Sequence, residues 1–132
     1  MHVYTRILAG VGCPEMIKNN KQLPKFHFIG QVITVNPCQI KETTEYKKAG
    51  DFRIELSQLE NKIDNNAEAL IIRTQLDYSS LQTKNYSNTN WPYICPKAAA
   101  YIRNIGVKHL LIDQPSVDRE LDGGKLLAHK AF

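Results

Sequence analysis

Two short apolar runs, each bounded by polar residues, set the fold class of this chain. Residues 69–74 read Ala-Leu-Ile-Ile-Arg-Thr and residues 107–112 read Val-Lys-His-Leu-Leu-Ile. Runs of this length and composition predict buried β-strands. Between them, Pro96 suits the first position of a helix, residues 98–102 continue it, and Gly106 ends it. A strand, a crossover helix and a second strand predict an α/β domain with parallel pairing.

The remaining segments carry weaker patterns. Residues 26–35 are aromatic and β-branched on both alternating faces, which predicts a strand covered on both sides. Residues 38–53 are polar and predict a loop or an edge excursion. After Ile54, apolar residues recur three and four apart up to Ile63, and Ser57 with Glu60 could form a capping box, which predicts an amphipathic helix that ends near residues 65–66. Residues 75–95 are rich in Ser, Asn, Thr and Tyr, and predict a long functional or mobile loop.

Composition narrows the class of protein further. The chain has 132 residues, 42% of them hydrophobic and 23% charged, which fits one folded domain over residues 1–132 and excludes disorder, collagen and coiled coil. No apolar run approaches the roughly 18 residues that a membrane-spanning helix needs. The three cysteines are widely spaced and no export signal precedes them, so we expect a reduced, cytoplasmic protein.

Charge gives little support for binding nucleic acid or RNA. The formal net charge is +4, from 17 basic and 13 acidic residues. Nucleic-acid binders concentrate basic residues on one element and interleave them with aromatic residues. The lysines of this chain are instead scattered over strand flanks and a polar segment. We therefore expect no nucleic-acid partner and no membrane partner.

The densest group of reactive side chains follows the second apolar run. Asp113, Ser116 and Asp118 lie within six residues of one another in a turn-rich segment, and His129 follows downstream. The carboxyl ends of strands are where α/β sheets place reactive side chains. The same Asp and Ser residues are also ordinary turn formers that bond backbone N–H groups, and His129 is equally compatible with a packed or surface position.

Two other histidines have a simpler interpretation. His27 alternates into the apolar run of residues 26–35, and His109 lies inside the run of residues 107–112. Both positions predict a histidine that packs in the core rather than one that reacts.

One part of the sequence carries a family resemblance. It is the run Gly106-Val-Lys-His-Leu-Leu-Ile-Asp-Gln-Pro-Ser-Val-Asp118, followed by His129. This part resembles the carboxyl half of the cyclase-like metal-dependent hydrolases. That family includes bacterial kynurenine formamidase. Residues 86–96, Tyr-Ser-Asn-Thr-Asn-Trp-Pro-Tyr-Ile-Cys-Pro, resemble the loop and helix start that precede this strand in the family. The resemblance covers residues 23–132, and residues 1–22 are divergent.

The resemblance implies a swivelling β/β/α fold with a mixed sheet, and a homo-oligomer. It implies hydrolysis of the amide C–N bond of a small molecule like N-formylkynurenine, a step of tryptophan catabolism. A divalent metal, zinc or manganese, would activate water by lowering its pKa from about 15.7 to about 7.

The resemblance also assigns roles to single residues. His129 matches the general acid and base that passes a proton to the leaving amine. Asp113, Ser116 and Asp118 fall among the substrate-binding residues. Trp91 is placed there too, as part of an aromatic wall with neighbouring tyrosines, although packing of the loop onto the sheet is the favoured explanation of this residue.

This chain differs from the resembled family most clearly at the metal-binding motif. The family pattern is His-x-Gly-Thr-His-x-Asp-x-Pro-x-His, onto which only His2 and Thr5 align. Arg6 stands at the second histidine, and a permanently charged guanidinium cannot ligate a cation. A catalytic zinc normally takes three protein ligands. His2 alone therefore predicts that a metal is not bound stably.

The carboxyl end of the sequence also differs from the resembled family. The resembled family has an acidic partner beyond the histidine, whereas the sequence stops at Phe132, so we expect the His129 imidazole to lack an orienting group. These departures predict a fragment or degenerate member, weakly active at best. The alternative is a non-catalytic module that uses the inherited fold to associate with itself or with a full-length homologue, because incomplete sheets leave unpaired edges.

Overall fold

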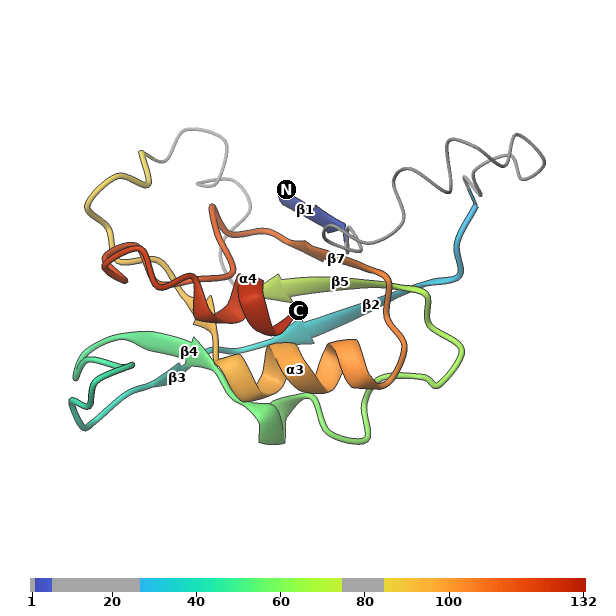
Figure 1. The fold of residues 1–132 in the computed structure, drawn as a ribbon, viewed down its shortest axis with the longest axis horizontal. Coiled ribbons are helices and arrows are strands. Elements are labelled where there is room, and N and C mark those ends of the chain that lie inside the picture. The colour runs from blue at the N-terminus through green and yellow to red at the C-terminus, as the bar shows by residue number, and fades with distance from the viewer. Residues whose placement is uncertain (1, 6–26, 75–84) are drawn as a thin grey trace.

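The structure is a computed structural model that describes residues 27–74 and 85–132 with their side chains and residues 2–5 as backbone. Figure 1 shows how its elements are arranged. They are, in chain order, β1 His2–Thr5, β2 Gly30–Val35, β3 Cys38–Gln39, β4 Phe52–Ile54, the 3₁₀ turn η1 Leu56–Gln58, β5 Ala69–Thr74, β6 Tyr93–Ile94, α3 Pro96–Asn104, β7 His109–Ile112 and α4 Leu127–Ala131.

The strands form two sheets in a mixed α/β arrangement. The larger sheet has the order β1-β7-β5-β2, in which β7, β5 and β2 are parallel and β1 is antiparallel to β7. The smaller sheet has the order β3-β4-β6. The α/β class and the parallel pairing expected from the sequence are therefore confirmed. Among the described residues, no helix is long and apolar enough to cross a membrane.

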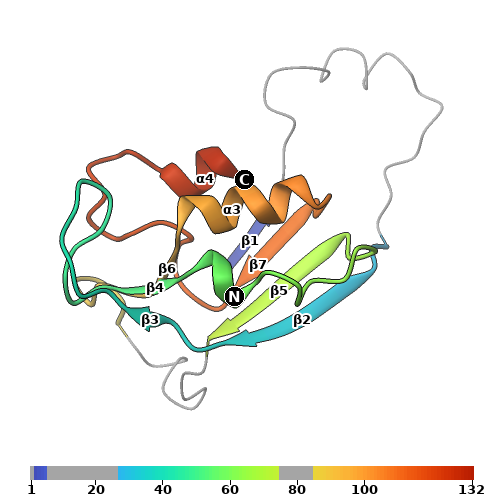
Figure 2. The same ribbon diagram turned by 90° about the horizontal axis from the view of Figure 1, so that it is seen from below.

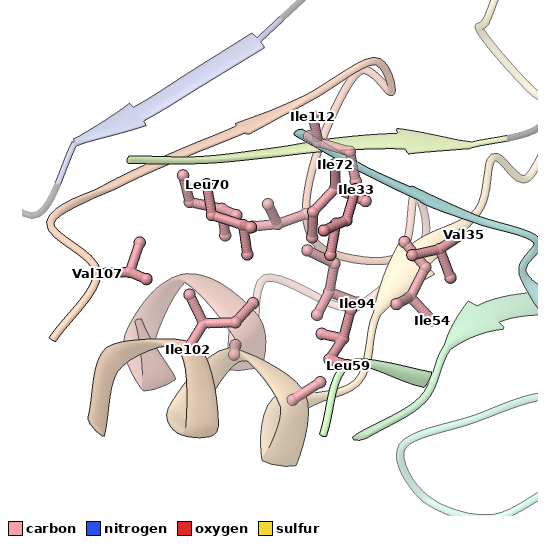
Figure 3. Close-up of a cluster of buried hydrophobic side chains, with 14 of the residues drawn as sticks. Ile33, Val35, Ile54, Leu59, Leu70, Ile72, Ile94, Ile102, Val107 and Ile112 are labelled. Atoms are coloured by element: carbon pink, nitrogen blue, oxygen red, sulfur yellow. The ribbon is translucent and has the colours of Figure 1, made fainter. Parts of the chain in front are cut away.

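The core lies on one face of the larger sheet. Figure 2 shows α3 and α4 together on that face. Side chains such as Leu70 and Ile72 lie between the strands and α3, opposite Ile102, and all three are fully buried (Figure 3). Complete burial of one Leu or Ile side chain contributes about 1.5–3 kcal/mol to folding. This packing fixes the sheet against the helices and so fixes the loops at the carboxyl ends of the strands.

The predicted unit of strand, helix and strand is confirmed by β5, α3 and β7. Helix α3 begins at Pro96, whose missing N–H costs nothing at a helix start. The Sγ of Cys95 accepts a hydrogen bond from the Ala98 N–H at 3.3 Å and caps the helix. The chain leaves the helix through Gly106, whose φ of +97° suits glycine.

The prediction for residues 26–35 was wrong in two respects. The strand β2 begins at Gly30, and in the described residues it lies at the edge of the larger sheet, paired with β5. Val32 is 55% exposed, so the strand is covered on one face and open on the other. His27 precedes the strand and is exposed, not buried in the core. The residue pattern failed because β-branched residues favour strands without reporting how many faces are covered.

The predicted helix of residues 54–63 was also wrong. Ile54 ends strand β4, and the chain then makes the 3₁₀ turn η1 followed by further turns. The capping box forms between Glu55 and Gln58, and not between Ser57 and Glu60 as expected. Leu59 and Ile63 are buried as the spacing of apolar residues suggested, but they pack from a turn and not from a helix.

The smaller sheet carries a polar excursion beside the main sheet. Strands β3 and β4 pair antiparallel, and β4 pairs parallel with β6. The excursion of residues 38–53 expected from composition thus contains two short strands. In the predicted loop of residues 75–95, residues 75–84 lie outside the described residues, and residues 93–94 form β6.

Candidate active site

A carboxylate and an imidazole contact each other after strand β7. The Nδ1 atom of His129 contacts the Oδ2 atom of Asp118. The Asp118 side chain is 6% exposed, while that of His129 is 38% exposed. An ionised carboxylate only accepts hydrogen bonds, so Nδ1 is the donor and Nε2 is left as the basic nitrogen.

The same carboxylate also caps the start of helix α4. Asp118 Oδ1 accepts the N–H of Ala128 at 2.6 Å, and Asp118 Oδ2 accepts the N–H of His129 at 3.2 Å. Both donors belong to the first turn of α4, whose N–H groups have no partner within the helix. Asp118 therefore fixes both the backbone and the ring of His129. The expectation that the imidazole lacks an orienting group was wrong, because Asp118 supplies it from upstream in the sequence.

Two other predicted site residues hold Asp118 in place. The Ser116 Oγ atom accepts the N–H of Asp118 at 3.1 Å, which is the turn-forming role weighed against the functional one. The indole Nε1 of Trp91 donates to the Asp118 carbonyl oxygen at 3.0 Å. The structure thus brings Trp91, Ser116, Asp118 and His129 together, with the first two acting on the backbone of Asp118.

Asp113 makes hydrogen bonds that join the ends of two strands. Its carboxylate accepts the backbone N–H of Thr74 at 2.9 Å and the Thr74 hydroxyl at 3.0 Å. The neighbouring Gln114 is fully buried and donates from Nε2 to the Thr74 hydroxyl oxygen at 2.9 Å. The Oε1 atom of Gln114 has no hydrogen-bond partner among the described residues. Asp113 therefore links the end of β7 to the end of β5 by hydrogen bonds.

The described residues do not fit the metal site of the resembled family. His2 lies in β1 with its Cα opposite that of Ile112, at the edge where β7 ends. In the described part of the chain, no three His, Cys, Asp or Glu side chains are grouped so that they can hold a metal ion. The donors among the described residues therefore fall short of the three ligands of a catalytic zinc site.

Sequence patterns gave no indication of a second buried carboxylate, Asp51. It is 1% exposed and accepts hydrogen bonds from Arg119 Nε at 2.8 Å, Asn90 Nδ2 at 2.8 Å, the Tyr93 hydroxyl at 3.0 Å and the Lys48 N–H at 3.0 Å. Arg119 directly follows Asp118 in the sequence. Asp51 therefore ties the polar excursion to the segment that carries the Asp118–His129 pair.

The electrostatics of this second carboxylate follow from its donors. Burial acts to raise the pKa of Asp51, but hydrogen bonds from Arg119, Asn90, Lys48 and Tyr93 outweigh it and hold the pKa below its ordinary value. Burial, followed by the hydrogen bond to Asp51, raises the pKa of Tyr93 above its ordinary value. Asp51 is therefore ionised and Tyr93 is a neutral donor at neutral pH.

These features define an α/β protein in which a carboxylate on the loop after β7 orients a histidine on helix α4. An imidazole held in this way can accept a proton at Nε2 and return it to a leaving group. A comparison with family models matches residues 2–119 to the Cyclase family, described as "Putative cyclase". The chain belongs to this family, whose members are generally metal-dependent. Searches of curated proteins and of solved structures returned no match.

Proposed function

We propose that the chain is a weakly active hydrolase of the cyclase family that cleaves the amide C–N bond of an N-formylkynurenine-like molecule. The proposal includes the swivelling β/β/α fold of the kynurenine formamidase group, a role in tryptophan catabolism, a zinc or manganese ion at the level of the family, and a homo-oligomer in the cytoplasm. It rests on the family match and on the resemblance of residues 106–118 and His129 to that group.

The observation that carries the proposal is the bond between His129 Nδ1 and Asp118. With Nδ1 donating, Nε2 takes a proton from the water that attacks the amide carbon. The C–N bond then breaks, and the same proton passes from Nε2 to the leaving nitrogen, so that a carboxylic acid and an amine result. The described residues do not form a cation site, so the steps assigned to this chain are those of His129 and its partners.

The test is hydrolysis of N-formylkynurenine by the wild type, by His129→Ala and by Lys130→Ala, an exposed neighbour on α4. We expect slow turnover in the wild type and in Lys130→Ala, and a decrease in kcat/KM of about 100-fold in His129→Ala. Each protein is assayed with added zinc, with added manganese and with a chelator. Turnover that is equal in wild type and His129→Ala contradicts the proposal, and so does a wild type that is inactive under all three conditions.

A second candidate function, self-association without catalysis, is favoured by the open side of β2. Within the described residues this strand pairs with β5 on one side, and Ile29 and Val32 are 63% and 55% exposed beside it. Unpaired strand edges recruit partners, and a second copy of the chain offers the same edge. Light scattering after size exclusion is expected to give a dimer or larger species, which Val32→Lys shifts toward monomer. A monomeric wild type contradicts this candidate.

A further inference from the structure

A pocket of about 250 Å³ lies between two segments that are far apart in the sequence. One wall is formed by residues 43–48, between β3 and β4, and the other by residues 118–127. Tyr93, Ile94 and Pro96 complete the lining. The pocket therefore lies where the polar excursion faces the segment that leads from Asp118 to α4.

Three contacts join the two sides of the pocket. Lys125 Nζ lies 3.3 Å from Glu45 Oε1 and 5.1 Å from the ring centre of Tyr46. Beneath them, Arg119 Nε donates to the buried carboxylate of Asp51 at 2.8 Å. A cavity between walls that are already tied together needs little ordering when a ligand enters. The pocket is thus preformed.

The carboxylates on the two walls are already engaged. Glu45 pairs with Lys125. Asp122 accepts the backbone N–H groups of Gly124 at 2.7 Å and Leu126 at 2.8 Å. The charge of Glu45 is therefore balanced by Lys125, and both oxygens of Asp122 already accept backbone N–H groups.

Two lysines of the same lining have no ion-pair partner among the described residues. Lys47 and Lys48 both line the pocket, and in the described part of the chain neither side chain has an ion pair or a hydrogen bond. Each ammonium group carries three donors and one positive charge. These two lysines are the basis on which an anionic ligand is expected at this pocket.

The rest of the lining suits an apolar body. Ile94, Pro96 and Leu127 line the pocket together with Leu121, whose side chain is 74% exposed. Tyr46 adds an aromatic ring at the same wall. An apolar ligand group would remove Leu121 from water, which is favourable by roughly 25 cal/mol for each Å² buried.

We infer that this pocket binds a small organic anion, a carboxylate carried on an aromatic or branched apolar body. The carboxylate lies against Lys47 and Lys48, and the apolar body lies against Leu121 and Ile94. Asp118 is part of the lining but His129 is not. The site therefore adjoins the Asp118–His129 pair without including the imidazole, and anion binding there is measured separately from hydrolysis.

The test uses phenylacetate and two molecules of similar shape, the neutral phenylacetamide and the cationic 2-phenylethylamine. Calorimetry and amide NMR titration follow binding to the wild type, to the double variant Lys47→Met with Lys48→Met, and to Lys62→Met, an exposed lysine that does not line the pocket. Methionine keeps an apolar stem of similar length and removes the charge.

We expect phenylacetate to bind with a Kd of about 1 mM or lower, with shifts confined to residues 43–48 and 118–127. The amide, the amine and the double variant are each expected to lose about tenfold or more in affinity, because one charge-assisted hydrogen bond is worth that much. Lys62→Met and His129→Ala are expected to bind as the wild type does.

Three results overturn the inference. They are an amide or amine that binds as tightly as the acid, a double variant with unchanged affinity, and the absence of saturable phenylacetate binding. None of these results bears on hydrolysis, because binding is measured without turnover. Conversely, a protein without hydrolytic activity that still binds phenylacetate through Lys47 and Lys48 supports this site and contradicts only the proposed reaction.

Discussion

Asp51→Ala is expected to lower the free energy of unfolding by about 3–5 kcal/mol, because it leaves a buried ionic network without its anion. The Arg119 guanidinium then loses its carboxylate partner, and the buried Tyr93 hydroxyl and the Asn90 side-chain amide lose their acceptor. A buried donor without an acceptor costs about 1–3 kcal/mol, and a charged one costs more. The change is measured by urea unfolding followed by circular dichroism.

The matched control is Glu45→Gln, which removes the anion of an exposed pair. The side chains of Lys125 and Glu45 are 44% and 67% exposed, so this variant is expected to lose less than about 1 kcal/mol. Asp51→Asn, which keeps the shape of the side chain and removes the charge, is expected to fall between the two. An Asp51→Ala protein as stable as Glu45→Gln would show that the network adds nothing to folding.

The contribution of Asp51 also has a defined dependence on pH. Its pKa in the folded chain is below the ordinary value of 3.8, so the folded state binds this proton less readily than the unfolded state does. The stabilisation is then complete above that ordinary value and is lost as the pH falls through the lower, folded value. The difference in stability between wild type and Asp51→Asn is therefore expected to be constant from pH 5 to 7, within error, and to shrink below about pH 4.

The elements that could be predicted from sequence are those whose signals are local. Strand β5, helix α3 and strand β7 each carry a complete pattern within a few residues, with Pro96 at the helix start and Gly106 at its end. The order of these patterns also indicated parallel pairing, because a connection that contains a helix allows a crossover. No distant contact had to be known for any of these predictions.

The wrong predictions depended on distant contacts. The spacing of Ile54, Leu59 and Ile63 is compatible with a helix, but Ile54 pairs within a sheet with Ile94, far along the chain. In the same way, whether residues 26–35 are covered on one face or two depends on which elements pack there. Hydrophobic spacing reports that a residue is buried and not which element buries it.

The residues of the candidate site also fall into two groups, those that the sequence indicates and those that only the fold brings together. Asp118 and His129 could be selected because acid, hydroxyl and imidazole gather after a predicted strand, although their mutual contact could not. Asp51 could not be selected, because its partner Arg119 lies 68 residues away in the sequence and nothing around it is distinctive. Lys47 and Lys48 were interpreted as scattered surface charge, since only the fold places them in a pocket with Asp118.

Asp118→Ala is expected to lower the free energy of unfolding by about 2–3 kcal/mol and to release α4 from the loop that precedes it. The substitution removes the acceptor of the N–H groups of Ala128 and His129 as well as that of the imidazole. Ala128 is 1% exposed, so its N–H is left buried without a partner, at a cost of about 1–3 kcal/mol. Unfolding by urea and hydrogen exchange at the amides of α4 measure the two effects.

The matched variant His129→Ala separates the helix cap from the imidazole. It keeps both backbone hydrogen bonds to Asp118 and removes a side chain that is 38% exposed, so a loss of about 1 kcal/mol or less is expected. In Asp118→Asn, ¹⁵N spectra of the His129 ring are expected to show a mixture of tautomers, because the anionic acceptor of Nδ1 is gone. If His129→Ala proves as destabilising as Asp118→Ala, the carboxylate acts through the ring alone and the capping of α4 contributes nothing. An unchanged tautomer in Asp118→Asn would mean that another group orients the imidazole, and the role of Asp118 in proton transfer would then be lost.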